Sequence, residues 1–434
     1  MSHVEHSHSV EISASRLRKK NMMRTAGLCL LGILFALGSL HTKTLGAAWL
    51  GLCIWGFWGA FNLRDIATNK LISRVAFTWL TYCGIALVLA SICVFIWAED
   101  GDILNPQLRL LFPAVAALFL IRRNSISTPI RIGMTHAVAA ASILGFLWSA
   151  FWVAQGADVR ASLASNAIPW AVAISFNACL LLPCALAEDK SAAQRWFWLF
   201  GVACAIGAVL LSQSRGAFLV IPWCGLVYAW FWHQKKYVSH TGFHRTLIGL
   251  LCAVAILLAG AWWGPGDVLR IRQAVQNIQE FKSVENYNSS GGARLYLWSL
   301  AWDGIKRSPW VGIGSVERMR LIQHAGDGGN DDELAKLSTV RQLGHVHNQY
   351  LNAALDGGAI GLAALLALLA GMAIATRQLA RIDPVASWQL GGVLFMHATA
   401  SVTNVNFLHN YYVMALSLAA VIPLLIARNA SSSQ

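Results

Sequence analysis

Residues 76–97 read AFTWLTYCGIALVLASICVFIW, a run of 22 residues without a charged side chain. A helix of this length is about 33 Å long, which matches the hydrocarbon thickness of a bilayer. Arg74 precedes the run, and Glu99 and Asp100 follow it. The stretch therefore predicts a helix that crosses a membrane.

The composition of the whole chain agrees with a membrane protein. Of its 434 residues, 56% are hydrophobic and 12% are charged, whereas about 25% of the residues of a soluble domain are charged. The 19 tryptophans suit a protein that is anchored at two membrane interfaces. The net charge of +13 does not indicate nucleic acid as a partner, because polytopic proteins collect Lys and Arg on the cytoplasmic side. The nine cysteines lie in or beside apolar runs, which predicts buried thiols rather than zinc ligands or disulfides.

We predict an all-α polytopic membrane protein with about twelve transmembrane helices and one large helical periplasmic loop. The apolar segments are, approximately, residues 25–40, 45–62, 76–97, 107–121, 135–154, 167–187, 195–213, 216–232, 246–264, 350–375, 386–402 and 410–427. With both termini in the cytoplasm, the short segments on the outer side hold few basic residues, namely Lys43, Arg109, Arg160 and Arg215.

This topology divides the chain into five parts. Residues 1–24 form a cytoplasmic N-terminal tail, residues 25–264 hold spans 1–9, residues 265–345 form the periplasmic loop, residues 346–427 hold spans 10–12, and residues 428–434 form a cytoplasmic tail. Helical spacing of apolar residues in the loop predicts helices over 267–282 and 293–305. The Gly-, Asp- and Asn-rich stretch 325–332 predicts a turn or lid.

Arg215 is the first candidate for chemistry, because it lies between two apolar spans that no soluble loop separates. A charged group at such a place is a functional candidate by default, and a guanidinium can hold two phosphate oxygens at once. Gly216 lets a ligand approach the backbone. The alternative, without a role in catalysis or substrate binding, is a side chain that extends to the phosphate of a membrane lipid.

Arg294 follows Ser289-Ser290-Gly291-Gly292 at the expected start of a helix. Free backbone N–H groups at a helix start attract anions, and an adjacent Arg adds positive charge. A solvated surface charge is the alternative. The turn at residues 308–314 (SPWVGIG) is expected to shape the loop without a catalytic role.

The sharpest cluster is His345-Val346-His347-Asn348-Gln349-Tyr350-Leu351, where the loop re-enters the membrane. A neutral imidazole can take a proton from an attacking hydroxyl, and Asn348 can cap or orient a following helix. If the segment is helical, His347 and Leu351 share a face. A metal site would need a third ligand such as His324, Asp331 or Asp332, and the spacing does not favour one. Further polar residues near the last outer turn could line the same cavity: His397, Asn404, Asn406, His409 and Asn410.

Four of these motifs, in this order, resemble the O-antigen ligase and O-antigen polymerase superfamily of bacterial inner-membrane glycosyltransferases. They are Ser214-Arg215-Gly216-Ala217; Ser290 to Arg294 with Trp298; Pro309 with Gly312-Ile313-Gly314; and His345 to Leu351 with Gly358 and Gly361. They cover roughly the second half of the chain, while the first half contributes only its length and number of spans.

The resemblance implies that the donor is a glycan on undecaprenyl diphosphate at the periplasmic leaflet of the bacterial inner membrane. The acceptor would be a hydroxyl of the lipid A core in a ligase, or another repeat unit in a polymerase. It implies neither a metal nor another cofactor. In that reaction Arg215 and Arg294 would hold the diphosphate, and His347 would be the base, with His345 as its orienting partner or as the base itself. Asn348, Ser214 and Tyr350 would support them.

Two other functions remain open from the sequence. Twelve spans with charge inside the membrane also suit a transporter, although the two halves of the chain lack matching loops and Asp356 is the single candidate for an intramembrane carboxylate. Ligases that attach glycans to Ser or Thr of proteins are a smaller option. Among these functions, we expect an O-antigen ligase with an inverting, metal-independent mechanism, and the polymerase is the first alternative.

Overall fold

The structure is a computed structural model that describes residues 26–60, 70–123, 125–187, 190–234 and 287–428. Within these ranges every regular element is a helix. Six helical segments are long and apolar enough to cross a membrane: α3 (Lys70–Trp97), α5 (Thr128–Ala154), α7 (Ala167–Leu186), α8 (Ala192–Leu211), η2 with α9 (Arg215–His233) and α16 (Gln349–Ala380). The protein is therefore a polytopic membrane protein.

The remaining apolar segments are also helical. They are the helix Ala26–Leu37, α2 (Thr42–Ala60), α4 (Asn105–Arg122), α17 (Pro384–Ala400) and α18 (Asn410–Ile426). Eleven of the twelve predicted segments thus coincide with helices. The ninth, residues 246–264, lies outside the described residues, as do the predicted helix 267–282, the N-terminal tail 1–24 and all of the C-terminal tail 428–434 except Arg428.

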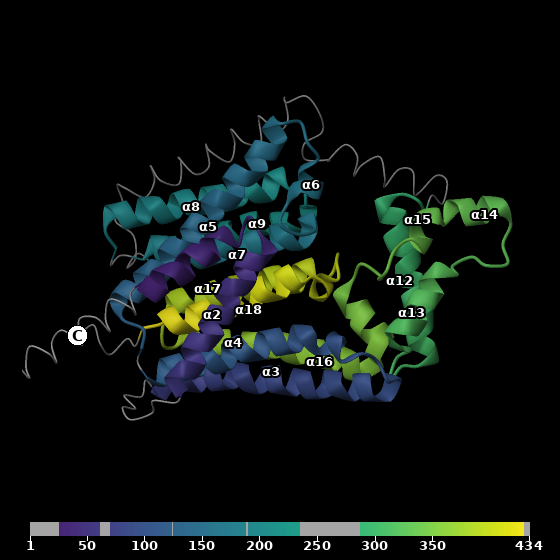
Figure 1. Cartoon of the computed structure of the whole chain (residues 1–434), viewed down its shortest axis with the longest axis horizontal. Helices are drawn as coiled ribbons and strands as arrows, with labels where there is room; N and C mark the ends of the chain where they lie inside the picture. The colour runs from purple at the N-terminus through teal and green to yellow at the C-terminus, as the bar shows by residue number, and fades with distance from the viewer. Residues whose placement is uncertain (1–25, 61–69, 124, 188–189, 235–286, 429–434) are drawn as a thin grey trace, which may run out of the picture.

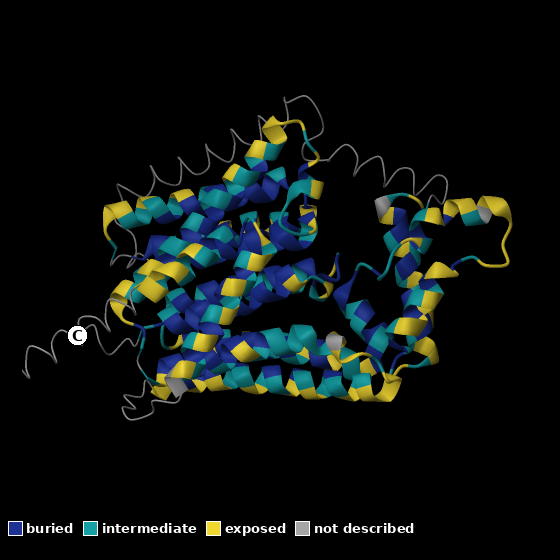
Figure 2. Ribbon diagram, in the orientation of Figure 1, coloured by how far each residue is buried: buried dark blue, intermediate teal, exposed yellow. Residues whose placement is uncertain are grey.

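Helix α7 is the centre of the bundle, because it contacts α5, α8, α9, α17 and α18. Nearly all of its residues are buried, whereas the surrounding helices expose apolar side chains on their outer faces, as expected where lipid replaces water. The longest pairing joins α16 to α3 (Figure 1). Figure 2 shows the buried residues gathered inside the bundle.

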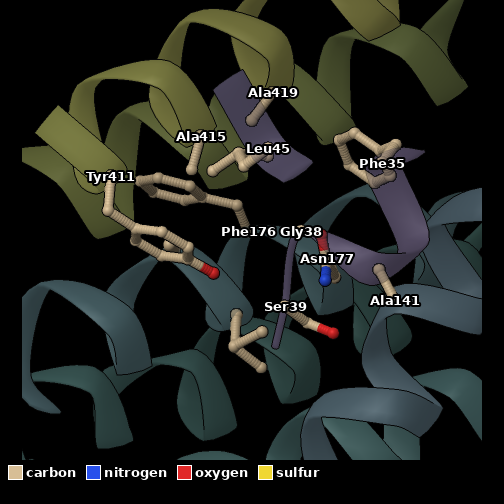
Figure 3. A pocket seen from close by; sticks show the side chains of 12 residues that line it. Phe35, Gly38, Ser39, Leu45, Ala141, Phe176, Asn177, Tyr411, Ala415 and Ala419 are labelled. Atoms are coloured by element: carbon tan, nitrogen blue, oxygen red, sulfur yellow. The ribbon is translucent and has the colours of Figure 1, made fainter. Parts of the chain in front are cut away.

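Buried polar groups accompany this packing. A cavity of about 20 Å³ lies among the helix Ala26–Leu37, α5, α7 and α18, and Figure 3 shows Ser39 and Asn177 beside it. A space of this size holds about one water molecule. The cavity is therefore a feature of the bundle core rather than a substrate site.

Four helices form a cap at one end of the bundle (Figure 1): α12 (Ser290–Arg307), α13 (Gly314–Gln323), α14 (Asp331–Lys336) and α15 (Ser338–Arg341). The cap has its own apolar core, in which Ala293, Leu297 and Ala301 of α12 recur at helical spacing. Leu355 of α16 belongs to the same core, so the cap is packed onto the membrane helices. Short helices complete the fold: η1 (Gly101–Leu104), α6 (Val159–Ser162), η2 (Arg215–Leu219), α9 (Val220–His233) and η3 (Asn406–Leu408).

The predicted loop helix is confirmed, but it begins earlier than expected. The Ser289 side chain accepts a hydrogen bond from the Gly292 N–H at 3.0 Å, so α12 starts at Ser290 and the two glycines lie in its first turn. The prediction placed the start at residue 293, after the two glycines, whereas the serine cap starts the helix before them. The turn expected around 325–332 is present and ends where α14 begins.

Helix α16 is broken at Gly358, which has φ 59° and ψ −147°. A break leaves backbone groups without helical partners, and the turn 308–314 supplies them. The Ile313 N–H donates to the Leu355 carbonyl at 2.8 Å, and the Ala359 N–H donates to the Pro309 carbonyl at 2.8 Å. The SPWVGIG turn therefore locks the cap to the broken helix by backbone contacts.

We predict that Gly358→Ala destabilises the protein. A Cβ atom at this position would lie 2.3 Å from the Trp310 backbone, and the positive φ adds strain to any side chain. The expected loss is about 1–3 kcal/mol of the free energy of unfolding, measured as a lower midpoint of thermal unfolding in detergent. Gly84→Ala is the matched control, because a Cβ there meets no atom within 4 Å, and it should be neutral or slightly stabilising. Equal midpoints for the two variants would contradict the role given to Gly358.

Candidate active site

Helix α12 presents Arg294 and Trp298 on one face, because they lie four residues apart. The Trp298 indole N–H donates to the Val346 carbonyl at 3.0 Å, which places this face against the histidine segment. Arg294 lies in the second turn of α12 rather than at its first residue. Four residues of α12 precede Arg294, so this residue does not open the helix as the sequence predicted.

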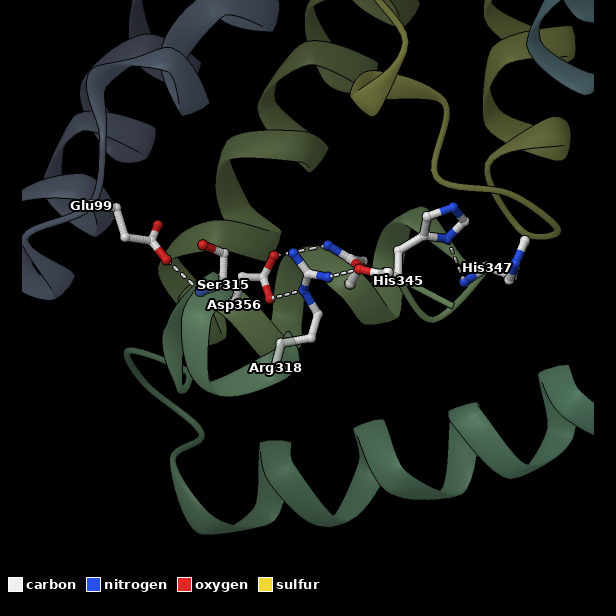
Figure 4. A network of polar contacts seen from close by, with 8 residues as sticks. Glu99, Ser315, Arg318, His345, His347 and Asp356 are labelled. Carbon is white, nitrogen blue, oxygen red and sulfur yellow. Dashed lines mark hydrogen bonds and ion pairs between the residues drawn. The ribbon is translucent and has the colours of Figure 1, made fainter. Parts of the chain in front are cut away.

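The two histidines lie in a short non-helical segment directly before α16. The His347 N–H donates to Nδ1 of His345 at 3.2 Å, and the ring centroids are 4.2 Å apart (Figure 4). Nδ1 of His345 is thus an acceptor, so the proton of the neutral ring is on Nε2. His347 has φ 52°, which is uncommon for a residue other than glycine. Because α16 begins at Gln349, the idea that His347 and Leu351 share a helical face is wrong.

Asn348 and Tyr350 anchor the start of α16. The Asn348 side chain caps the helix by accepting hydrogen bonds from the N–H groups of Tyr350 and Leu351 at 3.0 and 3.1 Å. The Tyr350 hydroxyl donates to the Ala398 carbonyl of α17 at 2.9 Å. Both side chains therefore hold the helix whose first residue follows the histidines.

Arg215 begins η2, immediately after the end of α8. Ser214 is buried, and its hydroxyl donates to the Ala167 carbonyl at 3.0 Å, so it fastens this junction to α7. Gln213 has φ 58°, and its carbonyl accepts a hydrogen bond from Nη1 of Arg160 at 3.4 Å. Arg160 is thus brought from α6 to the junction that carries Arg215.

Arg294 of the cap is influenced by the charges of Arg160 and Arg215 at this junction. The pKa of Arg294 is lowered mainly by burial, and further by the positive charges of Arg160 and Arg215. Arg160 and Arg215 therefore each lie near enough to Arg294 for their charges to act on it. Sequence reasoning selected Arg215 and Arg294 but missed Arg160. The available signal was that Arg160 is one of the few basic residues on the side of the membrane where such residues are scarce.

Both imidazoles are neutral at pH 7. The pKa of His347 is lowered to about 4, mainly by burial and next by the positive charge of Arg294, while a hydrogen bond with the Asn404 side chain acts in the opposite direction. Burial also lowers the pKa of His345 to about 3, together with the charges of His347 and Arg318. A neutral imidazole can accept a proton, so both rings are in the state that a general base requires.

The polar residues of the last outer turn fall into two groups. Asn404 lies near His347, to whose side chain it is hydrogen-bonded, and His409 lies near both imidazoles, since its charge acts on the pKa of each. His397, by contrast, is buried in the bundle, where its Nδ1 lies 2.8 Å from the Tyr412 hydroxyl. Only the first group adjoins the candidate site.

The third ligand considered for a metal has another contact. Nδ1 of His324 lies 2.6 Å from a carboxylate oxygen of Asp327, on the exposed side of the cap. Among the residues that the structure describes, no group of three His, Cys, Asp or Glu side chains could hold a metal ion.

The larger cavity of the protein lies elsewhere. It has a volume of about 840 Å³ and is lined by apolar side chains of the helix Ala26–Leu37, α2, α5, α8 and α18. None of the predicted histidines and arginines lines it. The chemistry-bearing residues therefore gather at the junction of the cap with the bundle and not at this apolar cavity.

Comparison with known proteins identifies a family whose pattern matches part of this chain. Residues 200–366 match a family described as O-antigen ligase, a stretch that contains Arg215, Arg294, His345 and His347. The family covers O-antigen ligases and polymerases, which are glycosyltransferases of bacterial membranes. A stretch of 179 residues is also 28% identical to an uncharacterized protein of Haemophilus influenzae. That alignment covers 39% of this chain and 41% of the relative, so the chain spans about two fifths of the protein it matches.

We predict that Arg294→Gln raises the pKa of His347. The substitution removes a positive charge that disfavours the imidazolium, so the protonated form gains stability and the pKa rises above about 4. Titration of histidine-labelled protein by NMR in detergent measures the change. Arg320→Gln is the control, because Arg320 is exposed and pairs with Glu317. An unchanged His347 titration in the Arg294 variant would contradict the arrangement described above.

Proposed function

We propose that this chain, which carries an O-antigen ligase domain at residues 200–366, transfers O-antigen glycan from undecaprenyl diphosphate to a hydroxyl of the lipid A core. The family match supports a lipid-linked glycan as donor in general terms. The observation that carries the proposal is the gathering of the charges of Arg160, Arg215 and Arg294 beside two neutral imidazoles. The negatively charged diphosphate requires the positive charges of the arginines, and the attacking hydroxyl requires an imidazole that can accept its proton.

The proposed reaction is a single displacement. The acceptor oxygen forms a bond to the anomeric carbon as the bond from that carbon to the diphosphate oxygen breaks, which inverts the anomeric centre. The hydroxyl proton passes to His347, and undecaprenyl diphosphate leaves with the bonding electron pair. General base assistance is worth about two to four powers of ten in rate. Neither a metal nor another cofactor has a step in this scheme.

The arginines stabilise the charge that develops on the leaving group. Donors that are already in position cost no reorganisation during the reaction, and removing one such donor typically costs about 10²–10³ in rate. Bound diphosphate also offsets the positive charge of Arg294, which lowers the pKa of His347 in the free protein. His347 therefore becomes a stronger base once the donor is bound.

The proposal includes a twelve-span topology with both termini in the cytoplasm and the cap in the periplasm of a bacterial inner membrane. It is supported by the helices found at eleven of the twelve apolar segments and by the small number of basic residues on the outer side. In this orientation the arginines and histidines lie at the periplasmic leaflet, where the lipid-linked donor is presented.

Purified protein with a defined lipid-linked donor and lipid A core tests the reaction. We expect His347→Gln to lower kcat by about 10²–10⁴, and Arg160→Gln, Arg215→Gln or Arg294→Gln to lower it by about 10²–10³ each. The exposed residues His324 and Arg320 supply matched controls, His324→Gln and Arg320→Gln, which should retain wild-type rates.

The same assay has outcomes that would overturn the scheme. Loss of transfer on addition of a chelator would reject the metal-independent mechanism. If the variants kept full transfer with both lipids on one leaflet, the transporter alternative would gain support, since a transport defect leaves the chemistry intact.

Deletion of the gene decides between the ligase and the polymerase. Loss of a ligase should leave bare lipid A core, with the glycan still on its carrier. Loss of a polymerase should leave core that bears a single repeat unit. Gel electrophoresis of the lipopolysaccharide measures this difference, and a single-repeat band would reject the ligase in favour of the polymerase.

A further inference from the structure

Arg318 of the cap connects a membrane helix to the histidine segment. Its Nε donates to Oδ1 of Asp356 in α16 at 2.7 Å, and its Nη1 donates to the Gly344 carbonyl. The Asn352 side chain donates to the other carboxylate oxygen of Asp356 at 2.8 Å. Figure 4 shows Arg318 between Asp356 and the segment that carries His345.

Burial distinguishes this pair from the other ion pairs of the cap. The Arg318 side chain is 6% exposed and that of Asp356 is 24% exposed. On the same helix α13, Arg320 and Glu317 form a pair that is 66% and 51% exposed. Removing a charged pair from water is energetically unfavourable, and stability alone does not require such a pair. A role in holding the backbone in a particular conformation would explain why the buried ion pair is present.

Arg318 and Asp356 lie close to two irregular places in the backbone. Asp356 lies two residues before the break of α16 at Gly358, and Gly344 lies one residue before His345. The start of α13 is also held, because the carboxylate of Glu99, two residues after the end of α3, accepts a hydrogen bond from the Ser315 N–H. Arg318 therefore extends from a helix fixed at its start and joins two separate backbone irregularities.

We propose that Arg318 and Asp356 are positioning residues, which hold the Gly344 carbonyl and thereby orient His345 and His347 toward the guanidinium groups. The inference rests on the proposed function. The guanidinium suits the task because its rigid fork donates in two directions at once, to Asp356 and to Gly344, whereas an ammonium group is a point charge on a flexible stem. His347 itself needs such support, because its φ of 52° is not one that the free chain prefers.

Arg318→Lys is the decisive variant, because it keeps the positive charge and removes the fork. The charge matters in the design, since Arg318, His347, His409 and Arg294 all lower the pKa of His345. With lysine in place, a loss of activity reflects geometry rather than a changed protonation state. Arg320→Lys is the matched control on the same helix.

A double variant separates positioning from stability. Arg318→Met with Asp356→Asn removes both charges and keeps a polar partner for Asn352. Replacing both members of a buried pair with uncharged groups often restores stability. The midpoint of thermal unfolding in detergent shows whether it does so here.

Two further measurements are made on the same samples. Hydrogen exchange of a peptide that covers residues 343–348 reports on the His347 N–H, which is bonded to His345. We expect Arg318→Lys and the double variant to raise this exchange about tenfold. Transfer kinetics should show kcat lower by about 10²-fold, with KM for the donor changed by no more than about twofold. Arg320→Lys should match the wild type in all three measurements.

Two results would overturn the proposal. One is a double variant in which kcat recovers along with the unfolding midpoint, which would show that the pair only stabilises the fold. The other is an Arg318→Lys protein with wild-type exchange and wild-type kcat. If the wild-type protein itself transferred no glycan, the proposed function would fail, while hydrogen exchange would still decide whether Arg318 holds the histidine segment.

Discussion

Positive charge held away from water at the junction of the cap and the bundle is the constraint on which the candidate site depends. Arg160, Arg215 and Arg294 come from α6, η2 and α12, and the pKa of Arg294 is lowered mainly by burial and further by the charges of Arg160 and Arg215. Like charges stay together only where the surrounding structure enforces it. A bound dianion would offset these charges, so the arrangement suits the anionic ligand that we propose. Burial is the main cause of the low pKa of His347, and the charge of Arg294 acts in the same direction, which links anion binding to base strength.

The scaffold enforces this arrangement mainly through the backbone. Positive φ values occur at Gln213, beside Arg215, and at His347, and a third lies at the break of α16. Each is held by contacts from another segment: Arg160 bonds to the Gln213 carbonyl, Trp298 bonds next to His347, and the 308–314 turn bonds across the break. Strain of this kind is typical of functional sites, because a rigid surrounding can hold groups where they would not settle alone.

Much of the fold followed from local sequence. A bilayer demands about 20 apolar residues per crossing, so the spans were visible as apolar runs, and eleven of twelve coincide with helices. Asn348 was also predicted as a helix cap, because capping depends only on residues that are neighbours in the chain. The start of α12 was misplaced because the cap at Ser289 outweighs the low helix propensity of two glycines. The matched family segment likewise contains the four residues that the motifs singled out.

The sequence by itself determined that this is a helical membrane protein and where its apolar segments begin and end. It also determined which histidines and arginines are candidates for a functional site. These properties depend on residue types and on spacing within a few turns. Only the tertiary structure decided that Arg160 joins Arg215 and Arg294, that Arg318 ties Asp356 to Gly344, and that α16 is broken against the 308–314 turn. Those contacts join residues tens of positions apart, and no local pattern marks their partners. Packing of the cap onto the bundle brings them together.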